Sequence, residues 1–322
     1  MGLFSKKTGN SDLHTVAFYN LENLFDIVDN PHTFDDDFTK YGKKRWNKKR
    51  YEKKLFKLGT AISNVGFDQA KKAPAIVGVA EVENQRVLED LVATKHLKNK
   101  DYGVVHYDSP DERGIDTGLL YQKRFFEVDQ SEVFPLQLVD EEGRPDHTRD
   151  ILKVSGVLNG EYVHVLVNHW PSRRAGANET QHKRILAAQN AQKVVQSIRS
   201  QEENPKIIIM GDFNDDPHST SIKEHLVTDE LYNPMETLLS YTKGSLSHKG
   251  SWNLFDQIIF THNFFETKEG GHKFAHADVF NPRFLAEYDG RYKGNPFRTY
   301  FGRKYLGGYS DHFPVYVHLR KQ

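Results

Sequence analysis

Acidic, amide and imidazole side chains recur in this sequence directly after short apolar stretches. The most specific case is residues 206–215, where an apolar run is followed by Gly211, Asp212, Phe213 and Asn214. In an extended chain the spacing of two places Asp212 and Asn214 on one face, while Phe213 points back into the protein. Asp212 is then positioned to activate a water molecule, and Asn214 to orient that water or a phosphate group.

Two further apolar stretches end in oxygen donors. Asn20 and Glu22 close the first of them, and extended chain would place both side chains on one face, able to hold a phosphate oxygen and a metal ion together. Glu81 ends the fully apolar stretch 75–80, where a carboxylate must be paired, bound to a metal or at the mouth of a site. An Asx turn at Asn20 is the open alternative.

His169 follows another apolar run and precedes a Trp-Pro turn that carries Arg173 and Arg174. A histidine in this position can donate to a phosphate oxygen, with guanidinium groups nearby to hold the negative charge. A purely structural role for His169 is the open alternative.

Asp256 and His312 are predicted to form an acid–base pair. Asp256 opens an apolar stretch, where an unpaired carboxylate is costly and needs a partner. Asp311 and His312 are adjacent, so their side chains project in different directions, one toward a metal and the other toward the reacting phosphate.

The elements that must position these groups are short strands alternating with a few helices. Their spacing predicts a single mixed α/β domain over residues 13–322, preceded by a loose polar tail at 1–12. The stretch 268–308 is predicted to be a loop insertion. Helices are expected at 48–65, 83–94 and 180–200, and strands at 15–20, 75–80, 103–107, 117–121, 152–158, 162–168, 206–210, 255–260 and 315–319.

Composition excludes several classes of protein. The absence of cysteine excludes disulfide frameworks, thiolate zinc sites and cysteine nucleophiles. The 44 basic and 44 acidic residues cancel, so polyanion binding would require a local patch. No apolar run is long enough to cross a membrane, and no secretory signal follows the first lysines. We therefore expect a cytoplasmic monomer without stable membrane association; secretion after removal of a signal is the open alternative.

Taken in order, these segments resemble the endonuclease/exonuclease/phosphatase superfamily. Its members are metal-dependent phosphoesterases that include pancreatic-type DNase, abasic-site endonucleases, sphingomyelinases and inositol polyphosphate 5-phosphatases. The resemblance extends from Asn20 to His312, and the segments around Asn20 and His169 look most like a bacterial branch of the family. The matching motifs are Asn20-Leu-Glu22, Glu81, Asn168-His169, Gly211-Asp212-Phe-Asn214, Asp256 and Ser310-Asp311-His312.

The resemblance implies a DNase I-like fold, a four-layer α/β/β/α sandwich with its site at one edge between two sheets. It also implies Mg²⁺ or Mn²⁺ as the cofactor. The positions that match the family's metal-binding group are Glu81, Glu22, Asp311 and Asn20. The positions that match its catalytic group are His169, Asp212, Asn214, Asp256 and His312. Some members carry Asp in place of Glu22, and some nucleases carry Tyr in place of His169.

Two segments bear on the substrate. Residues 40–57 hold ten lysines and arginines against a single acid, which suits a nucleic-acid backbone or forms a solvated helix face. Residues 288–305 interleave aromatic and cationic side chains, which suits stacking on bases or packing onto the body of the domain. The candidate substrate-binding residues are Arg173, Arg174, Asp116, Lys48 and Arg298, with Asp116 also a candidate partner for His169.

We therefore interpret the chain as a Mg²⁺-dependent phosphodiester hydrolase of nuclease type, with nucleic acid as the expected partner. A phosphatase or lipid phosphodiesterase of the same superfamily, acting on inositol phosphates or sphingomyelin, is the main alternative. A non-catalytic binding protein on the same scaffold is the third.

Charge reversal at Lys48, Lys49 and Lys53 tests the nucleic-acid interpretation. If the segment binds a polyanion, the triple variant raises KM for DNA or RNA more than for a small diester, and it flattens the salt dependence of KM. Equal effects on both substrates would show that the lysines are merely solvated.

Overall fold

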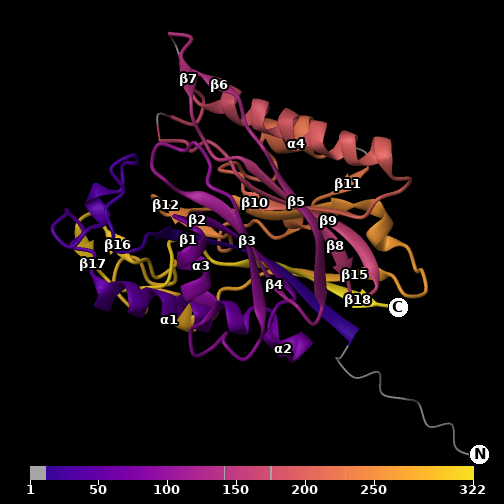
Figure 1. The fold of residues 1–322 in the computed structure, drawn as a ribbon, viewed down its shortest axis with the longest axis horizontal. Coiled ribbons are helices and arrows are strands. Elements are labelled where there is room, and N and C mark those ends of the chain that lie inside the picture. Colours follow the sequence, from indigo (N-terminus) through magenta and orange to yellow (C-terminus); the bar gives the residue numbers. More distant parts are fainter. Residues whose placement is uncertain (1–11, 141, 175, 229) are drawn as a thin grey trace, which may run out of the picture.

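The computed structural model describes residues 12–140, 142–174, 176–228 and 230–322, so most of the predicted tail at 1–12 lies outside it. Two six-stranded sheets pack face to face, and helices cover the outer face of each (Figure 1). This four-layer α/β/β/α arrangement confirms the predicted fold. Among the described helices, none is long and apolar enough to cross a membrane.

Both sheets are mixed, with parallel pairs β1–β2 and β9–β10 and antiparallel pairs elsewhere. In spatial order, the first sheet contains β15 (His272–Val279), β18 (Val315–Lys321), β1 (Leu13–Leu24), β2 (Ile76–Val82), β4 (Asp116–Gln122) and β3 (Tyr102–His106). The second contains β11 (Leu231–Tyr232), β14 (Asp256–Thr261), β10 (Ile207–Asp212), β9 (Glu161–His169), β8 (Ile151–Leu158) and β5 (Phe126–Phe134).

Helices α1 (Lys48–Asn64), α2 (Phe67–Ala70) and α3 (Gln85–Val92) lie on the side of the first sheet. The side chains of Asn47 and Asn84 cap α1 and α3 by accepting from backbone N–H groups of the first turn. Helix α4 (Gln181–Gln201) covers the second sheet with a separate buried apolar cluster, beside a π-helical segment, Ser221–Leu226.

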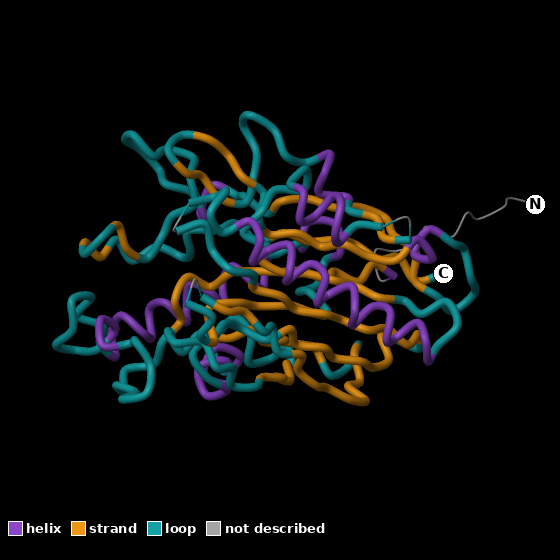
Figure 2. The backbone as a smooth tube through the Cα atoms, turned by 90° about the horizontal axis from the view of Figure 1, so that it is seen from above, coloured by secondary structure: helices purple, strands orange, loops and turns teal. Residues whose placement is uncertain are grey.

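Long loops gather at one end of the sandwich, opposite the C-terminus (Figure 2). They carry three short hairpins: β6 (Leu138–Val139) with β7 (Pro145–Asp146), β12 (Leu246–His248) with β13 (Ser251–Asn253), and β16 (Tyr300–Phe301) with β17 (Lys304–Tyr305). Short 3-10 helices occupy Asp36–Phe38, Pro234–Thr237, His262–Phe265 and Arg283–Leu285.

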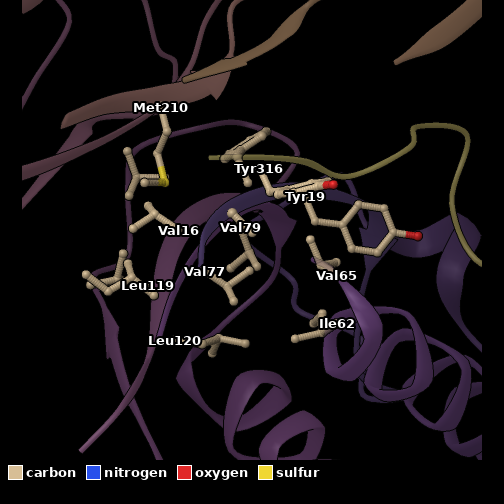
Figure 3. Close-up of a cluster of buried hydrophobic side chains, with 14 of the residues drawn as sticks. Val16, Tyr19, Ile62, Val65, Val77, Val79, Leu119, Leu120, Met210 and Tyr316 are labelled. Atoms are coloured by element: carbon tan, nitrogen blue, oxygen red, sulfur yellow. The ribbon is translucent and has the colours of Figure 1, made fainter. Parts of the chain in front are cut away.

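The main core lies between the two sheets and extends to α1 and α3. Figure 3 shows Met210 reaching from β10 toward Val16 of β1, with Ile62 of α1 farther down near Leu120. All four side chains are fully buried. Close packing of this kind fixes the two sheets relative to each other, and therefore fixes the strand ends that carry polar groups.

The nine predicted strands and three predicted helices are present within a few residues of their expected bounds. The prediction that 268–308 is entirely a loop insertion is wrong, because β15 within it pairs with β18 as the edge of the first sheet. A polar strand, β5, was not predicted, because its exposed residues break the apolar pattern.

Gly211 is the glycine on which the site most depends. A Cβ there would lie against the backbone carbonyl of Asn168 and 2.7 Å from the Asn168 Cβ, because β9 and β10 approach closely at this point. We expect Gly211→Ala to lower the free energy of unfolding by about 1–3 kcal/mol, the usual range for overpacking, as measured by denaturant unfolding.

Gly78→Ala is the matched control in a central strand of the other sheet. Its added Cβ meets the side chain of Met210 rather than backbone, and a methionine side chain adjusts more readily than a strand backbone, so its effect should be smaller. If the two variants are equally stable, close backbone packing at Gly211 is not a constraint.

Candidate active site

Strand register brings three of the predicted catalytic residues into one row. In the second sheet, Asp212 at the end of β10 is the register partner of His169 on β9 and of Asp256 on β14. All three side chains are buried. Because the row ends where the strands end, the polar groups face the loop-covered end of the sandwich.

His312 reaches this row from the segment that precedes β18 in the first sheet. Its Nδ1 lies 2.6 Å from Oδ2 of Asp256, so the predicted pair forms across the two sheets. Burial alone would lower the pKa of His312, but Asp256, Asp212 and Asp311 together raise this pKa well above its usual value. The imidazole is therefore held as the cation, with its Nε2 directed toward Asp212 at 3.9 Å.

Asp212 is the hub of the row. Its Oδ2 accepts a 3.0 Å hydrogen bond from the amide of Asn20, and its Oδ1 accepts one of 3.0 Å from the backbone N–H of Asn214. Burial raises the pKa of Asp212 to about 6, against the opposing effect of His312. A carboxylate with a pKa near neutrality can exchange a proton with water at physiological pH.

His169 is held neutral. Burial lowers its pKa well below the usual value, and the positive charges of Arg149, Arg113 and Arg174 add to the shift. Its Nε2 lies 3.9 Å from Asp212, and its buried Nδ1 has no hydrogen-bond partner within the described part of the chain. A neutral imidazole beside several guanidinium groups can donate to a phosphate oxygen without competing for a proton.

A second polar group lies on the α1 side of β1. The expectation that Asn20 and Glu22 share one face is wrong, because the β1–β2 register shifts after Asn20 and the backbone of Glu22 has φ 51°. Asn20 therefore turns to Asp212 in the second sheet, whereas Glu22 accepts from the backbone N–H groups of Thr299 (2.6 Å) and Tyr300 (3.3 Å).

Lys54 lies beneath Glu22 and is a residue that sequence reasoning missed. It was counted in the exposed basic segment, but its side chain is buried, with Nζ 2.7 Å from the carbonyl of Tyr309 and 3.7 Å from Oε2 of Glu22. Burial lowers the pKa of Lys54, and the carboxylates of Glu22, Asp311 and Glu81 act in the opposite direction. Its spacing from the apolar residues Tyr51, Leu55 and Leu58 was the available signal.

Glu81 and Asp311 are the more open members of this acidic group. Glu81 has φ 60° at a bulge in β2; its carboxylate accepts from the backbone N–H of Asn23 at 2.8 Å and lies 4.0 Å from Arg113. Asp311 pairs with Arg298 at 2.7 Å, whereas the neighbouring His312 pairs with Asp256. Burial alone would raise the pKa of Asp311, but His312, Arg298 and Lys54 together lower it.

This donor set fits a hard divalent cation. Glu22, Glu81 and Asp311 offer only oxygen ligands, the type that Mg²⁺ and Mn²⁺ prefer. Lys54, Arg113 and Arg298 lie beside these carboxylates, and burial raises the pKa of Glu22 to about 7. Asp212, Asp256 and His312 also place one candidate ligand atom each within 4.8 Å of one another, a buried group consistent with a metal site. The roles of individual ligands, including Asn20, whose Oδ1 already accepts from the backbone of Glu22, remain predictions.

Asn214 lies at the edge of the row, at φ 50°. Its side-chain amide donates to the carbonyl of Trp170 at 2.9 Å, which fixes its direction. Phe213 points inward, as predicted, and packs edge-on against Trp170 at 4.7 Å between ring centroids. Trp170 thus anchors the Gly-Asp-Phe-Asn turn through its ring and through its carbonyl.

Two predicted substrate-binding residues are occupied by structural contacts. Arg173 donates from Nε to the carbonyl of Asn214 at 2.7 Å and pairs with Asp215, so it supports the Asn214 turn. Asp116 is not the partner of His169, because its buried carboxylate accepts from Ser109 (2.9 Å from the backbone N–H) and faces His106.

The other three predicted substrate-binding residues lie in different surroundings. Arg174 is exposed, and within the described residues no hydrogen bond or ion pair holds its side chain. Arg298 lies at the site through its contact with Asp311. Lys48 is exposed on the first turn of α1, 3.9 Å from Glu52. Binding of substrate by these residues remains a prediction.

The basic segment 40–57 and the aromatic segment 288–305 pack against each other. Several cations of the first lie over rings in or beside the second, so part of each segment serves the fold. These contacts are Lys44 with Tyr300 (5.0 Å), Arg50 with Tyr305 (4.3 Å) and Lys57 with Tyr309 (4.5 Å). Lys48, Lys49 and Lys53 remain exposed.

Comparison with known proteins agrees with this geometry. A family model described as "Endonuclease/Exonuclease/phosphatase family" matches residues 15–321. No curated protein matches the sequence.

Solved structures with the same fold include TDP2 from Caenorhabditis elegans (16% identity, TM-score 0.58, covering 96% of this chain and 97% of that chain). They also include D. rerio TDP2 complexed with single-strand DNA product (14% identity, TM-score 0.55, covering 96% of this chain and 100% of that chain). A third is a mannosyl-6-phosphatase from Bacteroides thetaiotaomicron VPI-5482 (18% identity, TM-score 0.57, covering 95% of this chain and 99% of that chain). At these identities the likeness establishes the fold alone.

The Asp256–His312 pair generates a prediction for catalysis. We expect His312→Ala to lower kcat by about 10²–10⁴-fold, the usual contribution of a positioned acid–base group, while the variant still unfolds in one transition. Asp256→Asn should lower kcat by much of the same factor, because it removes the carboxylate charge that holds the imidazole of His312 protonated.

The double variant distinguishes a working pair from two independent residues. Its loss should be close to that of the worse single variant, since the two groups act as a unit. Losses that multiply would contradict the pairing. His276→Ala, on the edge strand β15 and 41% exposed, is the matched control and should keep full activity.

Proposed function

The chain belongs to the endonuclease/exonuclease/phosphatase family and is a phosphoesterase of that superfamily, and from this premise we propose that it hydrolyses phosphodiester bonds in nucleic acid with the help of a divalent cation. The observation that carries the proposal is the row formed by Asp212, His169 and the Asp256–His312 pair. It places a carboxylate of near-neutral pKa between a neutral and a charged imidazole.

In this proposal, water attacks phosphorus in line with the leaving oxygen. Asp212 accepts the proton of the attacking water, which its raised pKa of about 6 favours, and Asn214 orients that water. His169 donates a hydrogen bond to a non-bridging oxygen. His312, held as the imidazolium by Asp256, stabilises the negative charge that develops in the transition state and gives its proton to the leaving oxygen as the bond to phosphorus breaks.

Glu81, Glu22 and Asp311 are the proposed holders of Mg²⁺ or Mn²⁺. When bound, the ion neutralises charge on the phosphate oxygens. Lys54 supplies a fixed positive charge below Glu22 and limits the repulsion within this acidic group. Arg113 and Arg174 add positive potential near His169, which favours an anionic substrate.

Nucleic acid is the proposed substrate because positive side chains gather at the same end of the fold. Lys43, Lys44 and Arg45 line a pocket of about 510 Å³ together with Arg50 and Arg303. The D. rerio TDP2 structure with a single-strand DNA product supports the proposal by analogy of fold. The mannosyl-6-phosphatase of the same fold favours a second candidate, hydrolysis of a sugar phosphomonoester.

A substrate panel tests these functions directly. The panel contains plasmid DNA, RNA, bis-p-nitrophenyl phosphate, an inositol polyphosphate and mannose 6-phosphate, each with Mg²⁺, Mn²⁺ or EDTA. Cleavage of DNA or RNA that EDTA abolishes supports the first candidate. Turnover of the monoesters alone would replace it with the second.

Glu81→Gln tests the proposed metal group. We expect the variant to keep its fold and lose metal-dependent activity, because an amide cannot replace the anionic ligand. The measurement is kcat against Mg²⁺ concentration, with thermal unfolding as a check. Glu52→Gln, on the exposed face of α1, is the control. Unchanged turnover and Mg²⁺ dependence in Glu81→Gln would rule out this ligand.

A further inference from the structure

A pocket of about 850 Å³ opens beside Asp311 and Arg298. Its walls come from the β12–β13 hairpin and from the segment between Glu287 and Leu306. Neither wall belongs to the row of catalytic residues, so the pocket lies next to the proposed reaction centre rather than within it. A substrate whose phosphate reaches His312 would place a neighbouring group here.

Trp252 is a fixed wall of this pocket. Its ring stacks on Phe313 with 6.1 Å between centroids and 19° between planes. Phe313 is fully buried and follows His312 in the chain, so the position of Trp252 is tied to that of the catalytic pair. An aromatic ring held in this way offers a flat surface with little loss of conformational entropy on binding.

Tyr292 and Phe301 supply a second aromatic surface. Their ring centroids lie 5.4 Å apart, and their side chains are 43% and 49% exposed. Most other rings of this segment are buried or covered by cations of α1, whereas this pair faces the pocket. Two exposed rings kept together at the rim are characteristic of a binding surface.

The wall of this pocket carries charges of both signs. Glu287 and Asp289 line it and can accept hydrogen bonds from exocyclic amines, while Lys249, Arg291, Arg298 and Lys304 line it as well and can hold a neighbouring phosphate. The separate pocket around Arg303, on the other side of the β16–β17 hairpin, is lined by cations without an acid. The pocket beside Asp311 therefore differs from the basic pocket chiefly by its rings, because Trp252, Tyr292 and Phe301 line it and the basic pocket is lined by Tyr41 alone among aromatic residues.

We propose that the pocket beside Asp311 binds a nucleobase of the substrate, stacked on Trp252 and on the Tyr292–Phe301 pair, while the next phosphate lies in the basic pocket around Arg303. The inference rests on the proposed nuclease-type function and names the part of the substrate that this site recognises. Base stacking on an aromatic ring tolerates any sequence, so the preference is for a base rather than for a particular one.

Two matched substrates test the proposal: the p-nitrophenyl ester of thymidine 5′-phosphate and the same ester of abasic 1,2-dideoxyribose 5-phosphate. We expect the wild type to prefer the base-bearing ester in kcat/KM by about 5- to 100-fold, the range for stacking of one base. Trp252→Ala and, separately, Tyr292→Ala should lower kcat/KM for the base-bearing ester more than for the abasic ester, and so reduce this preference. Tyr241→Ala, fully exposed and outside both pockets, is the control.

Fluorescence gives a reading that does not depend on catalysis. Trp46 and Trp170 are buried, so quenching by an added ligand reports on Trp252, the half-buried tryptophan. Thymidine 5′-phosphate should quench the emission at lower concentration than 1,2-dideoxyribose 5-phosphate or mannose 6-phosphate. Because Tyr292→Ala leaves Trp252 on Phe313, it keeps the test valid if Trp252→Ala fails to fold.

The failures of the two proposals are distinguishable. If the variants lose the same share of activity on both esters while the wild type still cleaves nucleic acid, the base pocket is overturned and the nuclease function stands. Stronger quenching by mannose 6-phosphate would assign the pocket to a sugar and overturn the inference. A wild type that cleaves no diester would overturn the nuclease function, and preferential quenching by thymidine 5′-phosphate would then still support a nucleotide pocket.

Discussion

A buried charge pair at the seam between two sheets is the constraint on which the site depends. Asp256 opens β14 of the second sheet and is fully buried, whereas His312 precedes β18 of the first. An isolated buried carboxylate is costly, so the 2.6 Å contact between them is favourable only while both sheets keep their relative position. The Asn20–Asp212 hydrogen bond crosses the same seam and adds a second constraint.

Backbone conformation at the strand ends directs the polar side chains. Glu22, Asn23, Glu81 and Asn214 all have positive φ, which costs on the order of 1–3 kcal/mol for each non-glycine residue. Each lies where a strand stops pairing regularly or has just ended. Strain concentrated in this way is typical of functional sites, because the surrounding packing holds side chains in directions that regular strands cannot provide.

Packing between distant segments sets the charge of the site and its surroundings. Lys54 comes from α1, but its ammonium group is bound by Tyr309 and Glu22 from other parts of the chain. Other cations of the basic segment contact aromatic rings, line an open pocket or remain exposed, and Arg50 both contacts the ring of Tyr305 and lines the pocket. A chain without net charge can thus present a local positive surface beside an acidic group.

The residue pattern was sufficient for a mixed α/β domain, most strand positions and the Asp256–His312 partnership, and the resemblance of the motifs to a known family supplied the layered fold. Apolar runs identify buried strands, and a carboxylate that opens such a strand requires a partner. It also predicted different partners for the adjacent residues Asp311 and His312, and in the structure Asp311 pairs with Arg298 whereas His312 pairs with Asp256.

Only the tertiary structure decided where Glu22, Asp116 and Lys54 point. The first departs from its predicted face because a register shift and a positive φ interrupt β1, which residue spacing does not reveal. The others depend on partners that folding brings to them: Asp116 meets His106 across a strand pair, and Lys54 meets Thr299, 245 positions along the chain. Spacing determines which face of a regular element a residue occupies, but contacts between elements determine which charges meet.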